Sequence, residues 1–253
     1  MAKITAFTDL PYSGDHERCK LDLFRPAGET NAPLVVLIHG GGWTGGDRNQ
    51  YHQTCIALAG QGYGAVSVGY RLLDDAAWPD MPQDIMRGLE YVHRNADQLG
   101  VDASRAVTLG SSAGGHLALV IQAKASQWVR DGVVAVSPEI IGTVAQCPAA
   151  ILPVADEGRM ARLANGHQIE ELSPGHMSTE LFASVLVIHG DADETIPLQK
   201  SRQFVDKLKA AAVDAKLEVL KGAGHAFAYR LNQAPAQEAL KLTMPYLEKL
   251  LKP

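Results

Sequence analysis

Short runs of aliphatic residues recur along the chain, and longer stretches with helical spacing of apolar residues separate them. Continuous apolar runs are typical of strands that are covered on both faces of a parallel sheet. The pattern therefore predicts buried strands at Leu34–Ile38, Ala65–Val68, Ala106–Leu109, Val133–Val136 and Val185–Ile188, with a further strand-like stretch at Leu217–Leu220.

The intervals between these runs favour helices, because their apolar residues recur at the spacing that places them on one helix face. We expect helices over Pro79–Leu99, from Ser112 onward, over Leu198–Ala212 and over Pro235–Leu251. Strands and helices that alternate in this way form a mostly parallel sheet flanked by helices, joined by right-handed crossovers. The sequence thus predicts an α/β fold, and the absence of a linker or repeat predicts that residues 1–253 form a single domain.

Two parts of the chain lie outside this alternation. Lys3–Thr8 and Cys19–Phe24 precede the first buried run, and they predict an antiparallel pair at the edge of the sheet. The stretch Pro138–Gly175 is the least regular one, because glycine and proline interrupt it repeatedly. We predict no defined element there.

Composition narrows the classes of function. The chain has 253 residues and a net charge of −5, and it has no run of basic residues, which argues against nucleic-acid binding. Its three cysteines, Cys19, Cys55 and Cys147, are far apart and form no C-x-x-C pair, so we expect reduced thiols in the cytoplasm and no metal site. No apolar run approaches the roughly 20 residues that span a bilayer, so no membrane partner is expected.

The sharpest motif is G-x-S-x-G, formed by Gly110, Ser112 and Gly114 between a predicted strand and a predicted helix. A serine at this point lies on a sharp turn, with its hydroxyl above the sheet at the start of a helix. Ser111 is a rival nucleophile, but the glycine spacing selects Ser112. The alternative interpretation is a Gly/Ser loop that only connects the two elements.

A second motif, His39-Gly40-Gly41-Gly42-Trp43, directly follows a predicted strand. Such a glycine run exposes backbone N–H groups, which an acyl-transfer enzyme needs to stabilise an oxyanion. Gly40, Gly42 and Gly45 also satisfy G-x-G-x-x-G, a dinucleotide-binding pattern. The acidic residue expected about 20 residues later is missing, so this interpretation is weak.

Two later loops supply the remaining groups of a catalytic triad. Asp191, Asp193 and Glu194 follow a predicted strand, and His225 follows another in a glycine-rich loop. Serine, acid and histidine then occur in the chain order of an α/β-hydrolase. His189 closes a strand, and we interpret it as structural.

Together these motifs resemble the α/β-hydrolases, in particular the hormone-sensitive-lipase and feruloyl-esterase-like (BD-FAE-type) carboxylesterases. The resemblance implies an α/β-hydrolase fold, no cofactor, and hydrolysis of a small-molecule ester through an acyl-enzyme. The N-terminal segment is too short for the helical cap that is common in lipase-like relatives, so we expect a small or absent cap. It selects Asp193 as the acid beside Ser112 and His225. It also implies an oxyanion hole formed by the N–H groups of Gly41, Gly42 and Ala113.

The substrate is less well defined by the sequence. Trp43, Trp78 and Phe227 are candidate pocket residues, although they could equally pack in the core. A reduced cap favours short acyl chains, roughly C2–C4, or acylated carbohydrates. An arylformamidase or amidase on the same triad is the main alternative, and a non-catalytic ligand-binding homologue is the weaker one. The resemblance also allows a homodimer.

Overall fold

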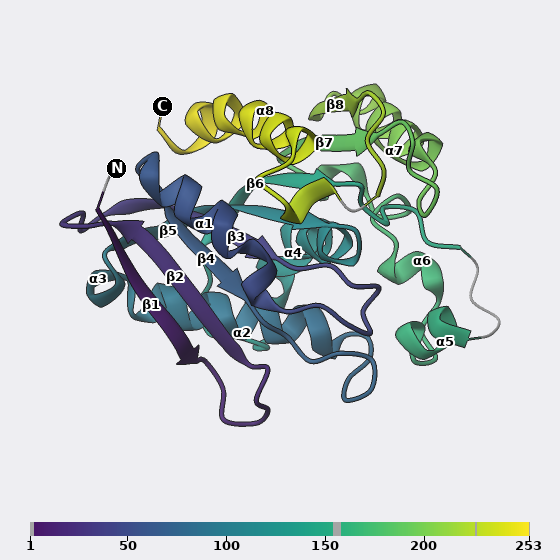
Figure 1. The fold of residues 1–253 in the computed structure, drawn as a ribbon. Helices are drawn as coiled ribbons and strands as arrows, with labels where there is room; N and C mark the ends of the chain where they lie inside the picture. Colours follow the sequence, from purple (N-terminus) through teal and green to yellow (C-terminus); the bar gives the residue numbers. More distant parts are fainter. Residues whose placement is uncertain (1–2, 154–157, 226, 253) are drawn as a thin grey trace.

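The computed structural model describes residues 3–153, 158–225 and 227–252. Within these residues the chain forms a sheet of eight strands in the order β1-β2-β4-β3-β5-β6-β7-β8 (Figure 1). The strands from β3 onward pair in parallel, whereas β2 pairs antiparallel with both β1 and β4. The strands are β1 (Ile4–Pro11), β2 (Lys20–Pro26), β3 (Ala32–Ile38), β4 (Gly64–Val68), β5 (Val101–Ser111), β6 (Glu139–Gln146), β7 (Ser184–Gly190) and β8 (Asp214–Leu220).

The sheet divides the core in two, as the apolar runs predict. In β3, Leu34, Val36 and Ile38 face one hydrophobic cluster, while Val35 and Leu37 face the other. This follows from the geometry of a strand, whose successive side chains point to opposite faces. All five side chains are fully buried, so each face of β3 requires a covering layer of helices.

Helices cover both faces (Figure 1). Residues of α1 and α8 contribute to one cluster, and residues of α2, α4 and α7 contribute to the other. The expected helix over Pro79–Leu99 is divided at Asn95 into α2 and a short α3. The helices are α1 (His52–Gly60), α2 (Asp80–Arg94), α3 (Ala96–Leu99), α4 (Ala113–Arg130), α5 (Gly158–Ala164), α6 (Ile169–Leu172), α7 (Leu198–Ala210) and α8 (Ala234–Leu251), with the short 3-10 helices η1 (Arg48–Tyr51), η2 (Thr179–Leu181) and η3 (Phe227–Tyr229).

One predicted strand is wrong. Val133–Val136 forms an irregular connection, and the strand lies later, at β6, inside the stretch that was expected to be irregular. β6 could not be recognised in the sequence because Gly142 and polar residues interrupt its apolar pattern. A Cβ on Gly142 would lie 2.5 Å from the Leu250 side chain and 2.7 Å from the Tyr246 hydroxyl, so α8 approaches the strand too closely for a larger residue.

The connection between β6 and β7 supplies a small cap, formed by α5 and α6 (Figure 1). It is attached to the loop after β4: the Trp78 N–H donates to the Leu163 carbonyl at 3.0 Å, and Arg162 donates to the Leu73 carbonyl at 2.9 Å. Of the helices in the described part of the chain, none has the length and apolar character needed to cross a membrane.

Candidate active site

Ser112 occupies the sharp turn between β5 and α4. Its φ of 56° lies in the left-handed region, which is unusual for a residue with a side chain. The turn is possible because glycine has no Cβ. A Cβ on Gly110 would lie 2.2 Å from the Gly114 carbonyl oxygen, and one on Gly114 would lie 2.0 Å from the Ile38 carbonyl oxygen. The two glycines of the motif are therefore required by close backbone contacts, and they lift the Ser112 side chain away from the sheet.

The three residues of the expected triad meet at the carboxyl ends of the strands. His225 Nε2 lies 2.8 Å from Ser112 Oγ, and His225 Nδ1 lies 2.7 Å from Asp193 Oδ2. The Asp193 side chain has no exposed surface, whereas the His225 side chain is 20% exposed. Of the three acids in the loop after β7, Asp193 is the one that the structure places beside His225.

The partners of His225 determine its protonation state. A carboxylate only accepts hydrogen bonds, so Nδ1, which faces Asp193, carries the hydrogen. Nε2 is then unprotonated and accepts the hydroxyl hydrogen of Ser112. This is the tautomer that a general base requires before the serine attacks.

Asp193 is held as a carboxylate. Burial alone would raise its pKa, but hydrogen bonds from the Ile196 N–H, His225 and the Thr195 N–H outweigh burial and keep the pKa below its usual range. Both N–H groups donate to Oδ1 at 2.9 Å, which leaves Oδ2 directed toward His225.

The glycine run after β3 offers free N–H donors beside the serine. Gly41 and Gly42 have φ values of 123° and 61°, and a Cβ on Gly41 would lie 2.2 Å from the Gly45 carbonyl oxygen. Among the described residues, no protein group accepts a hydrogen bond from the Gly41 or Gly42 N–H. Ala113 begins α4, where the first N–H groups have no partner within the helix. These are the three donors that the resemblance implies.

Tyr229 connects this loop to the loop of the histidine. The Gly40 N–H donates to the Tyr229 hydroxyl at 2.7 Å, and the Cβ position of Gly40 is 3.2 Å from Ser112 Cβ. Burial raises the pKa of Tyr229 to about 12, so its hydroxyl stays neutral. Sequence reasoning missed this residue, because a tyrosine four positions after His225 carries no local signal.

We expect Tyr229→Phe to lower kcat about tenfold, because it leaves the Gly40 N–H without an acceptor and loosens the oxyanion loop. KM for a small ester should change less, since this hydroxyl is bonded to the Gly40 N–H. Steady-state kinetics measure both. Tyr246→Phe is the matched control. The Tyr246 hydroxyl also accepts a hydrogen bond from a backbone N–H, that of Thr143 at 3.2 Å, but Tyr246 lies on α8 and not in the histidine loop. An equal loss in both variants would contradict a specific role for Tyr229.

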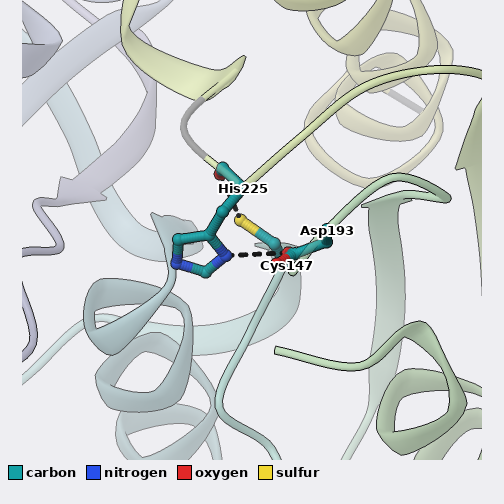
Figure 2. A group of neighbouring side chains, drawn as sticks. All are labelled: Cys147, Asp193 and His225. Atoms are coloured by element: carbon teal, nitrogen blue, oxygen red, sulfur yellow. Dashed lines mark hydrogen bonds and ion pairs between the residues drawn. The ribbon is translucent and has the colours of Figure 1, made fainter. Parts of the chain in front are cut away.

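Cys147 also contacts the triad from the end of β6. Its thiol donates to the His225 carbonyl at 3.1 Å, and Figure 2 shows it beside His225 and Asp193. One potential ligand atom from each of these three residues lies within 4.8 Å of the others. Burial, however, raises the pKa of Cys147 to about 12, so the thiolate that a metal requires is disfavoured. We interpret Cys147 as support for the histidine loop.

All three cysteines are buried free thiols. Burial raises the pKa of Cys19 and of Cys55 as well. The disulfide-free state predicted from their spacing is therefore what the structure shows, while the cytoplasmic location stays a prediction.

The candidate pocket residues have different surroundings. Trp43 is 4% exposed, its indole N–H donates to His116 Nδ1 at 3.3 Å, and the Arg159 guanidinium lies 6.0 Å from its ring centroid. Trp78 packs in the core beside Trp128, with ring centroids 6.4 Å apart. Phe227 is 5% exposed and belongs to the opposite core cluster. All three side chains are buried in the core clusters, and their role as pocket residues stays a prediction.

Two buried histidines near the site make folding sensitive to acid. Burial lowers the pKa of His39 and of His116 to about 4. In the unfolded state these histidines bind protons below about pH 6.5, whereas in the folded state they stay neutral down to about pH 4. Between these two pH values the unfolded state therefore binds more protons.

We therefore expect the free energy of unfolding to fall as the pH drops from about 6.5 to about 4, by up to about 3 kcal/mol per histidine. Urea unfolding at several pH values measures it. His116→Gln, which retains a donor for the Leu172 carbonyl, should reduce the slope. An unchanged slope in this variant would show that His116 does not contribute.

Known proteins are similar to this chain. Residues 21–136 match the BD-FAE family. The chain is 29% identical over 215 residues to Esterase LipC from Mycobacterium tuberculosis, an alignment that covers 78% of this chain and 53% of LipC. It is 30% identical over 199 residues to the probable carboxylic ester hydrolase LipM of the same organism, covering 70% of this chain and 45% of LipM. The chain thus spans about half the length of these relatives.

Solved structures match over nearly the whole chain. Esterase B from Lactobacillus rhamnosis, in a form inhibited by a C4-C4 SN3 tributyrin phosphonate, superposes with a TM-score of 0.86 at 27% identity, covering 98% of this chain and 86% of its own. The propionate-bound thermophilic esterase Est2 from Thermogutta terrifontis has a TM-score of 0.81 at 26% identity, covering 100% of this chain and 96% of its own.

Proposed function

Because this chain is an α/β-hydrolase of the BD-FAE and hormone-sensitive-lipase type, we propose that it is a serine carboxylesterase that hydrolyses small esters through an acyl-enzyme. The observation that carries the proposal is the continuous hydrogen-bonded path from Ser112 through His225 to the buried carboxylate of Asp193. A ligand-binding homologue without activity has no need for such a path.

The first half of the reaction transfers the acyl group to the enzyme. Ser112 Oγ attacks the ester carbonyl carbon while His225 Nε2 takes its proton, and Asp193 stabilises the imidazolium that forms. The tetrahedral intermediate then collapses: the bond to the alcohol oxygen breaks, and His225 returns the proton to the leaving alcohol. The acyl group is left as an ester of Ser112.

In the second half, His225 removes a proton from water, which attacks the acyl-enzyme. Collapse of the second tetrahedral intermediate releases the carboxylic acid and returns the proton to Ser112. In both halves the N–H groups of Gly41, Gly42 and Ala113 stabilise the oxyanion, and each donor contributes on the order of 3 kcal/mol in comparable sites.

Labelling the protein with a fluorophosphonate tests this proposal. The probe should add one phosphonyl group at Ser112, which peptide mass spectrometry locates, and labelling should stop activity. Ser112→Ala should not be labelled. A protein that hydrolyses p-nitrophenyl acetate but is not labelled at Ser112 would contradict the proposed nucleophile.

For the acyl group, we expect a preference for chains of roughly C2–C4, because the cap formed by α5 and α6 is small. Two solved relatives support this choice, since they bind a tributyrin phosphonate and propionate. A series of p-nitrophenyl esters measures it, with kcat/KM expected to fall toward C10–C16. Acetylated sugars and N-formylkynurenine belong in the same panel, and faster turnover of the formamide would favour the amidase alternative.

A further inference from the structure

A second histidine lies against the acid of the triad. His189 is near the end of β7, and its side chain has no exposed surface. Its Nε2 is 3.1 Å from Asp193 Oδ2 and 3.0 Å from the Ile196 carbonyl oxygen, while its Nδ1 is 2.8 Å from Ser201 Oγ on α7. The sequence suggested only a structural role for this residue.

The partners of His189 fix its tautomer. Both groups that face Nε2 are acceptors, a carboxylate and a carbonyl, so Nε2 carries the hydrogen. Nδ1 is then unprotonated and accepts the hydroxyl hydrogen of Ser201. The hydrogen on Nε2 bonds to the Ile196 carbonyl, and Nε2 lies 3.1 Å from Asp193 Oδ2, the oxygen that His225 uses.

His189 keeps this role as a neutral ring. Burial is the main cause that lowers its pKa, although the Ile196 carbonyl and Asp193 oppose the shift. The titratable groups that face this cluster are Asp193, His225 and Cys147, and burial raises the pKa of Cys147. Asp193 is therefore the anion that the surrounding donors share.

The coordination of Asp193 shows what His189 adds. A carboxylate has about four acceptor positions. The N–H groups of Thr195 and Ile196 occupy Oδ1, and His225 occupies one position on Oδ2. His189 Nε2 lies 3.1 Å from Oδ2 while its hydrogen bonds to the Ile196 carbonyl, so rotation of the buried carboxylate would lose this close polar contact.

We propose that His189 is a positioning residue of the triad, whose Nε2–H group, 3.1 Å from Asp193 Oδ2, holds that oxygen toward His225 while Ser201 and the Ile196 carbonyl hold the ring. This inference rests on the proposed serine esterase mechanism. It differs from a packing role, because it assigns the effect to the hydrogen on Nε2 and to its orientation.

The Nε2–H group near Oδ2 also moderates the charge that His225 experiences. Two N–H groups near one oxygen compete for its electron density, so removing His189 should leave a stronger partner for the imidazolium. The acid limb of the kcat/KM profile should then move toward higher pH, by roughly half a unit, which corresponds to about a threefold change in the ionisation equilibrium.

Three variants test the proposal. His189→Leu removes the donor, and we expect kcat to fall about tenfold with KM nearly unchanged, because Asp193 loses its fixed orientation. His189→Gln can present an amide N–H near the position of Nε2, and it should recover most of the activity and the original acid limb. His93→Gln is the matched control, because His93 lies on α2, away from the triad, and its Nδ1 bonds to the Ala103 carbonyl.

The outcomes separate cleanly. A folded His189→Leu variant with unchanged kcat and an unchanged acid limb would overturn the inference. A glutamine variant that is folded but no better than leucine, or an equal loss in the His93 control, would overturn it as well.

If the leucine variant does not fold, the Ser201→Ala variant tests the inference instead. This substitution leaves Nδ1 without its donor, and we expect about a threefold loss in kcat. An unchanged kcat would then overturn the inference. Long-range ¹H–¹⁵N NMR provides a direct readout, in which the His189 ring should be neutral with its hydrogen on Nε2.

Fluorophosphonate labelling distinguishes this inference from the proposed function. If Ser112 is labelled and the His189 variants behave as wild type, only the positioning role fails. If Ser112→Ala retains activity, the serine mechanism itself fails.

Discussion

Replacing Ser112 with alanine should lower kcat for a short-chain ester by about 10⁴- to 10⁶-fold, because the substitution removes the hydroxyl that lies 2.8 Å from His225 Nε2. The oxyanion donors and the binding contacts remain, so a small residual rate above that of water is expected. The substitution removes only Oγ and keeps Cβ, so the turn itself should not be disturbed. Circular dichroism and the urea midpoint should therefore stay close to wild type. Initial rates with p-nitrophenyl acetate measure the loss.

Ser111→Ala is the matched control for that experiment. Ser111 is 1% exposed, and its hydroxyl lies 3.4 Å from Cys147 Sγ rather than beside His225. Its loss should reduce kcat less than about tenfold, because it removes one internal hydrogen bond. If Ser111→Ala were inactive and Ser112→Ala active, the nucleophile would be Ser111.

Asp193→Asn should cost about 10⁴-fold in kcat, although it changes the shape of the side chain very little. The N–H groups of Thr195 and Ile196 hold the oxygen at Oδ1, which directs the new amide nitrogen at His225. His225 Nδ1 then faces a donor and must become the acceptor. Nε2 would carry the hydrogen and could no longer accept the Ser112 proton.

Glu194→Gln controls for loss of charge in the same loop, since Glu194 is exposed to solvent. We expect less than a threefold effect, in keeping with the small energies of exposed charges. Steady-state kinetics at one pH measure both variants, and NMR should detect the altered His225 tautomer in Asp193→Asn. Full activity in this variant would exclude Asp193 as the acid of the triad.

The fold was predictable where local pattern and burial agree. β3 and β7 are continuous apolar runs because both of their faces are covered, and Gly110 reflects a backbone contact with Gly114 within a short segment. Gly114 fits the motif spacing, but the contact that requires it is with the Ile38 carbonyl at the end of β3. β6 was not predictable, because Gly142 interrupts its apolar pattern. A glycine is needed there because α8, about a hundred residues later in the chain, packs closely against the strand. Its cause is visible only in three dimensions.

The candidate site divides in the same way. Motif spacing and chain order predicted Ser112, His225 and an acid after β7, since each follows its own strand in a parallel sheet and the carboxyl ends of those strands meet at one edge. The family resemblance selected Asp193 from the three acids of that loop. Tyr229 and His189 could not be recognised as parts of the site. A tyrosine or histidine is common in any loop or strand, and what distinguishes these two is the atom that each of them contacts.

The sequence by itself determined the fold class, the order of serine, acid and histidine, and the G-x-S-x-G motif, because these depend on periodicity, chain order and motif spacing. The tertiary structure decided which acid faces His225, that Tyr229 joins the oxyanion loop to the histidine loop, and that His189 shares Asp193 Oδ2. These arrangements depend on hydrogen-bond direction and on distances of about 3 Å between segments far apart in the chain, which no local pattern encodes.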